Sequence, residues 1–521
     1  MEEKIFRLAK PKRKGLLPIL FSRITIVVLL LVLQILIFVG LYGFLNEYFR
    51  LFSAAVTLFT YVMGIYLFCS TIDATSKLTW LLLLATFPVP TAFLLFYVRA
   101  NQRHGKVTER VLEQIRATQQ AIPQDARVTE KLERDGGGVD SLAHYLGESG
   151  CYPVYDRTEV KFFPLGEYKF AALLEELKKA EKFIFIEYFI IGEGYMWGEI
   201  LKILIEKAAA GVDVRVMYDG MCELAYLPSN YPELLAKYGI KAKAFSRFLP
   251  IVSSHYNNRD HRKILVIDGR VAFNGGVNLA DEYINYIHPF GHWKDTAVML
   301  KGDAVRSFTL MFLQMWNTWE EQPEYEPFLS VSVCEPEHPS GYVMPFGECP
   351  LDDYKAAESV YMDILNRANR YVHIMTPYLI LDGEMETALK FAAQRGVDVR
   401  ILLPGVPDKK FAYALAKSHY PSLLGAGVKI YEYTPGFVHA KIFVSDDCKA
   451  VVSTINLDYR SLYHHFECGT FLYRADCIAD IEADYQATLA QCRAVTEETM
   501  REEKSLYKLV GPLIKAAAPL M

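Results

Sequence analysis

The sequence has no closely spaced pair of cysteines. Its nine cysteines are odd in number and scattered, and no two of them form a C-x-x-C motif. Disulfide frameworks and structural zinc sites both depend on such spacing, so neither is expected, and reduced thiols in a cytosolic setting fit the pattern. The cysteines are Cys69, Cys151, Cys222, Cys334, Cys349, Cys448, Cys468, Cys477 and Cys492.

The chain also has no excess of positive charge. Its 56 lysine and arginine residues stand against 61 aspartate and glutamate residues, which gives a net charge of −5 and no basic stripe. Nucleic-acid surfaces need concentrated positive charge, so we expect no nucleic acid partner. The 52% apolar composition argues against a disordered chain, and 521 residues are too many for one core, so we expect two or three domains.

Long apolar runs are confined to the first hundred residues. Residues 24–45, 51–70 and 78–98 are three such stretches, and a helix over the first would span about 33 Å, enough to cross a bilayer. A cleaved signal peptide fits less well, because the first stretch is too long and no A-x-A site follows it. We predict a membrane anchor over residues 1–100, with two to three transmembrane segments, and a polar linker over residues 101–150.

The flanking charges leave the number of crossings open. Basic residues precede the first stretch and follow the third, and both flanks should stay in the cytoplasm. Both ends inside requires an even number of crossings, yet there are three candidates. Pro88 and Pro90 can bend the third, while the second is the most polar. We expect a multi-pass protein of the cell membrane with cytoplasmic catalytic domains.

One short motif occurs twice in the rest of the chain. Each copy reads H-x-K-x4-D, with an apolar run between the lysine and the aspartate, and each is followed by a turn of small residues that ends in asparagine. Two copies with the same downstream asparagine are far less likely to arise by chance than one. The alternative is a pair of ordinary buried strands with polar ends. The residues are His261, Lys263, Asp268 and Asn278 in the first copy, and His439, Lys441, Asp446 and Asn456 in the second.

The motifs lie in a larger internal duplication. Residues 184–220 and 372–405 share their pattern, including Gly-Val-Asp-Val-Arg at 211–215 and 396–400. The repeat is too long for a solenoid, so each copy should be a domain, at about 151–335 and 336–521. Strands alternate with helices, which predicts an α/β fold with a mixed sheet flanked by helices in each domain. Packing about a pseudo-twofold axis would place His261 opposite His439.

The duplicated residues suit transfer of a phosphoryl group. Neutral imidazole is a good nucleophile and proton carrier near pH 7, so one histidine can attack while the other acts as acid and base. Lys263 and Lys441 can stabilise a developing oxyanion, and the two asparagines can donate further hydrogen bonds. Two cations for one phosphate make a metal unnecessary, and no cluster of metal ligands stands at suitable spacing. We therefore expect no metal and no cofactor.

Carboxylates should complete the site. Asp268 and Asp446 belong to the motif but lie at the far ends of their strands, so we expect them to be structural. The carboxylate that accepts the other N–H of each histidine should come from elsewhere, as in a catalytic triad. Asp295 and Glu467, which follow the two asparagines, are the candidates.

With its paired motifs the chain resembles the phospholipase D superfamily over residues 150–490. The Asn-Leu-Asp-Tyr-Arg-Ser stretch at 456–461, Glu467 and the basic, apolar N-terminus are similar to bacterial cardiolipin synthases. The resemblance implies that one histidine attacks phosphatidylglycerol and releases glycerol. A second phosphatidylglycerol then attacks the phosphatidyl-histidine, which gives cardiolipin. It also implies that the six motif residues form the catalytic set, with the N-terminal His261 favoured as nucleophile, and that Asn278, Asn456 and Thr454 hold the phosphate.

The sequence departs from the family pattern in its first half. Gly276 stands where a hydroxyl residue is common, and the Asp-x-Arg-Ser stretch occurs only in the second half. Two other functions stay open: a phospholipase D-type hydrolase with water as acceptor, and a catalytically silent membrane scaffold, against which both intact motifs speak. A nuclease is disfavoured by the anchor. The lipid bilayer is the expected partner, and the acceptor and oligomeric state are not determined.

Overall fold

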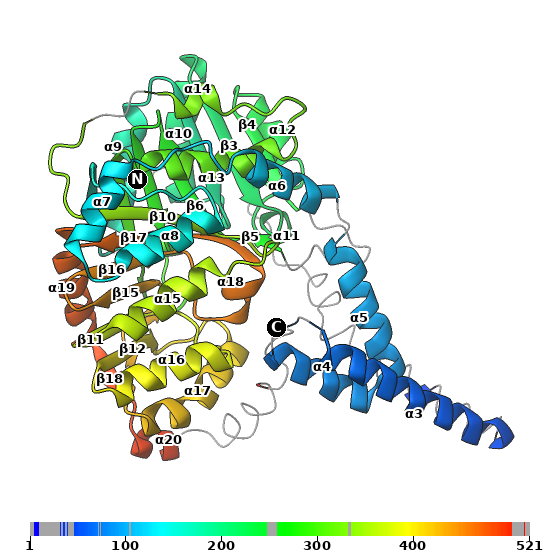
Figure 1. Cartoon of the computed structure of the whole chain (residues 1–521). Helices are drawn as coiled ribbons and strands as arrows, with labels where there is room; N and C mark the ends of the chain where they lie inside the picture. Colours follow the sequence, from blue (N-terminus) through cyan, green and yellow to red (C-terminus); the bar gives the residue numbers. More distant parts are fainter. Residues whose placement is uncertain are drawn as a thin grey trace.

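The computed structural model describes residues 5–9, 46–103 except 71 and 73, 106–246, 258–331, 335–502, and five isolated positions, which are residues 32, 35, 36, 39 and 515. Two α/β halves pack against each other, and three helices of the N-terminal region project from one side of this body (Figure 1). The prediction of an α/β fold with mixed sheets is confirmed.

The first half is built on a seven-stranded sheet in the order β1-β9-β7-β6-β2-β3-β4. Strands β2, β3 and β4 are parallel, and the other neighbours are antiparallel. The strands are β1 (Thr158–Phe163), β2 (Phe183–Tyr188), β3 (Asp213–Asp219), β4 (Lys241–Phe245), β6 (Lys263–Ile267), β7 (Val271–Gly275) and β9 (Ala297–Gly302).

The second half repeats this order as β10-β17-β16-β15-β11-β12-β13 and adds β18 at the edge. Strands β11, β12 and β13 are again the parallel ones. The strands are β10 (Tyr342–Glu348), β11 (Tyr371–Met375), β12 (Asp398–Pro404), β13 (Lys429–Tyr433), β15 (Ile442–Ser445), β16 (Lys449–Ser453), β17 (His465–Tyr473) and β18 (Cys492–Ala494).

Helices flank both sheets at corresponding places in the chain. The first half contains α9 (Gly166–Lys178), α10 (Tyr195–Ala209), α11 (Cys222–Ala225), α12 (Tyr231–Ala236), the 3₁₀ helix η2 (Asp281–Ile284), α13 (Val305–Asn317) and α14 (Glu326–Leu329). The second contains α15 (Ala356–Arg367), α16 (Gly383–Gln394), α17 (Lys410–Gly425), α18 (Tyr459–Tyr463), α19 (Cys477–Leu489) and α20 (Glu497–Glu502).

The repeated Gly-Val-Asp sequence joins a helix to a strand in each half. Gly211 follows α10 with φ 91°, and Gly396 follows α16 with φ 93°. L-residues with a side chain rarely adopt this backbone, so glycine ends each helix without strain. Val212 and Val397 are then buried as the chain enters β3 and β12. The repeated sequence thus forms the same turn from helix to strand in both halves.

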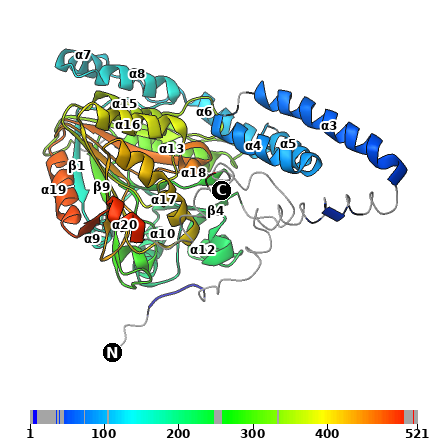
Figure 2. The ribbon, with the colours of Figure 1, turned by 90° about the horizontal axis from the view of Figure 1, so that it is seen from below.

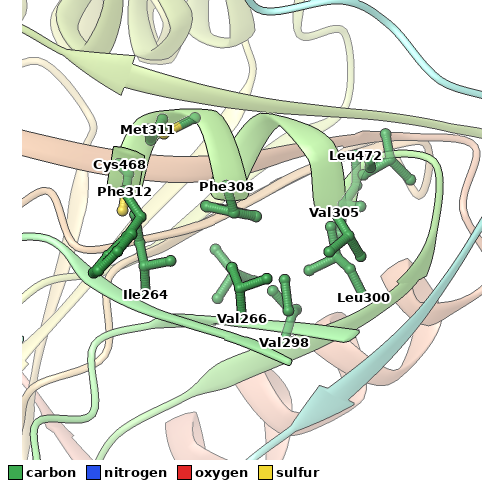
Figure 3. Packing of buried hydrophobic residues seen from close by; sticks show 14 of the residues in the cluster. Ile264, Val266, Val298, Leu300, Val305, Phe308, Met311, Phe312, Cys468 and Leu472 are labelled. Atoms are coloured by element: carbon green, nitrogen blue, oxygen red, sulfur yellow. The ribbon is translucent and has the colours of Figure 1, made fainter. Parts of the chain in front are cut away.

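One hydrophobic cluster contains residues of both halves. Helix α13 contributes Phe308, Met311 and Phe312, which pack against Ile264 and Val266 of β6. Figure 3 shows Cys468 and Leu472 of the second half beside the same helix. Such a core leaves little freedom for one half to move against the other.

Two short strand pairs also cross between the halves. Strand β5 (Arg259–Asp260), just before the first motif, pairs with β17 of the second half. Strand β14 (Gly436–Val438), just before the second motif, pairs with β8 (His292–Lys294) of the first half. The chain therefore enters each motif while hydrogen-bonded to the other half.

The structure describes part of the predicted anchor. Among the described residues, one helix, α3 (Asn46–Phe68), is long and apolar enough to cross a membrane, over Leu51–Phe68. The third stretch is split into α4 (Ala74–Thr86) and α5 (Pro88–Arg103), because the residue before a proline disfavours helical backbone. The stretch at 24–45 falls outside the described residues apart from four positions. Two to three transmembrane segments are therefore not confirmed.

The region predicted as a linker holds three helices, α6 (Lys106–Ala117), α7 (Ala126–Asp135) and α8 (Val139–Ser149). Buried side chains of α7 and α8, including Leu132 and Leu142, join the core of the second half. This segment thus packs on the half that follows later in the chain. The eight cysteines within the described residues are all unpaired.

Candidate active site

Backbone hydrogen bonds to the opposite half position both motif histidines. The amide of His261 donates to the carbonyl of Phe466 at 2.9 Å, and the amide of His439 donates to the carbonyl of Lys294 at 2.7 Å. In each case the acceptor is the residue just before a candidate carboxylate. The two motifs are close enough that Lys441 and His439 act electrostatically on His261.

Each histidine contacts a carboxylate of the other half. Nδ1 of His261 lies 2.8 Å from both carboxylate oxygens of Glu467, and Nδ1 of His439 lies 2.7 Å from Oδ2 of Asp295. Both carboxylates are fully buried, and each histidine is 7% exposed. A proton on Nδ1 would satisfy the carboxylate and leave Nε2 with a free lone pair. The arrangement thus presents two oriented imidazoles.

The electrostatic surroundings keep both imidazoles neutral. Burial, followed by the charge of Lys263, lowers the pKa of His261 well below its usual value. Burial and Lys441 lower the pKa of His439 to about 4, although Asp295 opposes this shift. Neutral imidazole is the form that can attack phosphorus or accept a proton.

The pKa values of the two carboxylates are shifted in opposite directions. Burial raises the pKa of Glu467 well above its usual value, against the opposing effect of Lys263. For Asp295 burial also acts to raise the pKa, but His439 and Lys441 outweigh it and the pKa is lowered. Asp295 is therefore the more readily ionised partner, and the two histidines are not equivalent.

Residues 276 and 454 give the two carboxylates different neighbours, although the Thr454 hydrogen bond itself lowers the pKa of Glu467 and only partly offsets its burial. The hydroxyl of Thr454 donates to Oε2 of Glu467. At the matching position, a Cβ on Gly276 would lie only 2.1 Å from Oδ1 of Asp295. A hydroxyl residue would collide with the aspartate, so the glycine makes room for the carboxylate.

Three buried lysines surround the histidines. Lys263 Nζ donates to the carbonyl of His261 at 2.6 Å, and Lys441 Nζ donates to that of His439 and lies 2.9 Å from its Nδ1. Burial lowers the pKa of Lys263 to about 8 and that of Lys441 to about 7. These are the cations that an anionic substrate would meet.

Lys169 is the third lysine, and the sequence pattern did not reveal it. It is fully buried on α9, and its Nζ donates to the hydroxyl of Tyr188 at 3.0 Å and to the carbonyl of Val277 at 3.1 Å. Burial lowers its pKa to about 7, with Asp295 opposing and Lys263 contributing. A lysine in an amphipathic helix usually faces solvent, so only the fold shows that this one faces the site.

The asparagines differ in their bonding. Asn278 accepts from the amide of Ile190 at 3.1 Å and donates to the hydroxyl of Tyr283 at 2.9 Å. Asn456 is 5% exposed, and its Oδ1 has no hydrogen-bond partner among the described residues. Asn278 thus has protein partners at both ends, whereas Oδ1 of Asn456 is an acceptor without a donor among the described residues.

The aspartates of both motifs lie at the other end of their strands. Asp268 accepts from the amides of Glu181, Lys182 and Phe183 at 2.7–2.9 Å. Asp446 accepts in the same way from the amides of residues 369, 370 and 371. Both therefore anchor the loop that enters the neighbouring strand, and neither joins the histidine cluster.

A third histidine lies in the cluster. His465 is 7% exposed, its Nδ1 has no partner among the described residues, and that atom lies 3.6 Å from Glu467 Oε1. The sequence motifs do not single out His465. Residues two apart on a strand share a face, so its spacing from Glu467 on β17 is the signal that could have found it. Within the described part of the chain, His261, His465 and Glu467 are the group whose ligand atoms could hold a metal ion. Glu467 is already engaged by His261 and Thr454.

Known proteins resemble this chain over both of its halves. The family model described as "Cardiolipin synthase, PLD-like domain" matches residues 173–316 and 361–489. An uncharacterized protein of Streptococcus mutans is 55% identical over 88% of this chain and 99% of its own length. A cardiolipin synthase of Alkalihalophilus pseudofirmus is 35% identical over 93% of this chain and 98% of its own.

A solved structure shows a related fold. The phosphatidylserine synthase of Haemophilus influenzae superposes with a TM-score of 0.53 at 15% identity, over 70% of this chain and 93% of that one. At this identity the similarity concerns the fold alone.

Proposed function

Since the chain belongs to the cardiolipin synthase family of proteins with phospholipase D-like domains, we propose that it condenses two phosphatidylglycerol molecules into cardiolipin and glycerol. The observation that carries this proposal is the pair of buried, neutral histidines, each held on a carboxylate of the other half and surrounded by lysines. The reaction is a phosphatidyl transfer between two alcohols.

In the first step Nε2 of His261 attacks the phosphorus of one phosphatidylglycerol. The P–N bond forms, the P–O bond to the glycerol headgroup breaks, and His439 gives a proton to the departing oxygen. The negative substrate would favour the protonated form of His439, which burial and Lys441 otherwise disfavour. Glu467 holds the Nδ1 proton of His261 throughout.

In the second step a headgroup hydroxyl of another phosphatidylglycerol attacks the phosphatidyl-histidine. His439 takes the proton of that hydroxyl, the new P–O bond forms, and the P–N bond to His261 breaks. The enzyme returns to its starting protonation state, so atoms and charge balance. Lys263, Lys441 and the Nδ2 group of Asn456 donate hydrogen bonds to the phosphoryl oxygens.

The unequal carboxylates favour this division of roles. Asp295 is the more ionised of the two, so it stabilises a positively charged imidazolium on His439, as an acid–base catalyst requires. Glu467, with its raised pKa, is the weaker stabiliser of an imidazolium and is therefore the less suitable partner for the acid–base histidine. The scheme uses no metal and no cofactor.

A membrane location matches a lipid substrate. The apolar helix α3 and the cardiolipin synthase relatives support attachment to the bilayer, where the diester lies. We place the catalytic halves on the cytoplasmic side, because basic residues flank the apolar region. Nothing in the net charge favours nucleic acid.

The decisive experiment is incubation of the full-length protein with labelled phosphatidylglycerol in detergent–lipid micelles, with EDTA present. Cardiolipin and an equal amount of released glycerol are the expected products. Phosphatidic acid with glycerol would mean that water is the acceptor. Absence of turnover by a folded sample on any phospholipid would favour the scaffold.

A further inference from the structure

The first described residues of the chain lie on the catalytic body, not beside the anchor helices. Residues 5–9 pass over α10 of the first half, and Figure 2 shows this segment on the far side of the body from α3. Phe6, Leu8 and Ala9 pack partly buried against the hydrophobic core of that half. Arg7 is exposed. The side chains on both sides of Arg7 are thus half-buried, and Arg7 alone in this segment faces solvent fully.

Helix α10 lacks a side chain at the position where residues 5–9 contact it. Gly198 lies within the helix, where glycine is normally unfavourable. A Cβ at this position would lie 2.5 Å from the carbonyl oxygen of Phe6, closer than atoms in contact can approach. The missing side chain is therefore what allows the N-terminal backbone to lie against the helix.

A polar group beside the gap faces the same segment. The carboxylate of Glu193 accepts from the hydroxyl of Tyr231 at 2.5 Å, and that hydroxyl accepts from Nε1 of Trp197 at 2.7 Å. Burial raises the pKa of Glu193, while the backbone amides of Leu8 and Ala9 oppose the rise. The N-terminal amides therefore lie where they can meet a buried carboxylate.

We propose that Gly198, Glu193 and Tyr231 form a docking socket for the chain's own residues 5–9, which straps the N-terminus to the catalytic body. The socket combines a backbone-sized gap at Gly198, a buried carboxylate whose pKa the amides of Leu8 and Ala9 lower, and an apolar rim for Phe6 and Leu8. It serves no step of the proposed reaction. The contacts of Phe6, Leu8 and Ala9 identify residues 5–9 as the segment that occupies the socket.

The strap supports an even number of membrane crossings independently of the flanking charges. Residues 5–9 and the residues from 106 onward belong to one folded body, so both lie on the same side of any membrane. If the region between them is the membrane anchor, as the proposed function requires, the chain crosses an even number of times. At least one of the three apolar stretches then does not cross fully.

Photo-crosslinking of the full-length protein in its native membrane tests the socket without reference to activity. A photoreactive amino acid at position 8 should crosslink to the peptide that contains residues 193–201. The same probe at position 7, whose side chain is exposed, should give far less of this product. Equal yields at positions 7 and 8, or products that map elsewhere, would overturn the docking.

A larger side chain at position 198 tests whether the N-terminal segment needs the glycine for its contact with α10. Gly198→Leu should reduce the position 8 crosslink by about tenfold or more, because the new side chain occupies the place of the Phe6 backbone. Leucine favours helix over glycine, so α10 itself is not weakened. Gly147→Leu on α8, where a Cβ meets nothing within 4 Å, should leave the yield unchanged. An unchanged yield in Gly198→Leu would contradict the proposal.

Labelling tests the even count. In a background with Cys69, Cys334, Cys448 and Cys492 changed to serine, Arg7→Cys and Glu109→Cys should react with a membrane-impermeant maleimide from the same face of sealed vesicles. Labelling from opposite faces would overturn the inference. Both tests are independent of turnover, so a protein that makes no cardiolipin can still pass them, and an active protein can still fail.

Discussion

Glu467 of the second half lies 2.8 Å from Nδ1 of His261 in the first half. The reciprocal contact, between Asp295 of the first half and His439 of the second, has the same form. Neither half therefore contains a complete histidine–carboxylate pair. The duplication has produced a site in which each copy supplies the orienting group for the other.

Removal of one carboxylate should expose this dependence. Glu467→Gln and Asp295→Asn should each lower kcat by about 10²–10⁴-fold, because the amide cannot hold the histidine in the reactive tautomer. Rates of purified, folded variants on phosphatidylglycerol micelles are the measurement. Asp303→Asn, which changes a half-buried carboxylate paired with the exposed Arg157, is the matched control. A near-normal rate in Glu467→Gln would show that orientation of His261 does not depend on it.

The sequence did not predict which carboxylate would contact which histidine. The two H-x-K-x4-D copies identified the histidines and lysines, and their position after the asparagines singled out Asp295 and Glu467. Which carboxylate serves which histidine depends on the strand pairs β5–β17 and β14–β8, and contacts of this kind between distant segments leave no local pattern. The same holds for Lys169, whose burial follows from the position of α9 and not from its neighbours in sequence.

The anchor was harder to predict for a different reason. Hydropathy treats residues 78–98 as one stretch, but Pro88 divides the helix, and composition alone does not say whether such a break ends a span. The docking of residues 5–9 is set by a missing side chain at Gly198 far along the chain. A single glycine in a helix has many causes, so the sequence pattern alone does not single out Gly198.

Trapping the covalent intermediate should assign the two histidines. In His439→Gln the first attack can still occur slowly, but the acid–base group for the second step is missing, so phosphatidyl-enzyme should accumulate on His261. In His261→Gln no adduct should form. Mass spectrometry of peptides prepared without acid treatment after incubation with phosphatidylglycerol would locate the adduct. An adduct on His439 in the His261 variant would reverse the roles.

The motif aspartates should affect stability more than chemistry. Each accepts three backbone amides, so Asp268→Ala should lower the free energy of unfolding by about 2–4 kcal/mol. Asp446→Ala should cost less, because the amides of residues 369 and 370 that it holds are exposed to water, which can replace the carboxylate. Thermal unfolding in detergent compares the pair. A folded Asp268→Ala protein that loses activity as fully as a His261 variant would contradict a purely structural role.

The substrate-free protein should lose stability as the pH falls from about 6.5 to about 4. The folded pKa of His439 is lowered to about 4 from 6.5, so between these values the unfolded chain binds a proton that the folded site refuses. Stability therefore decreases with falling pH, by at most about 3 kcal/mol for this group, and the effect is absent above pH 6.5. His439→Gln removes the titrating group and should flatten this part of the curve, whereas His338→Gln at an exposed position should leave it unchanged. The measurement is the unfolding temperature at pH 7 and pH 5. An identical drop in the wild type and in His439→Gln would mean that other groups control the acid response and that His439 is not held neutral by its burial.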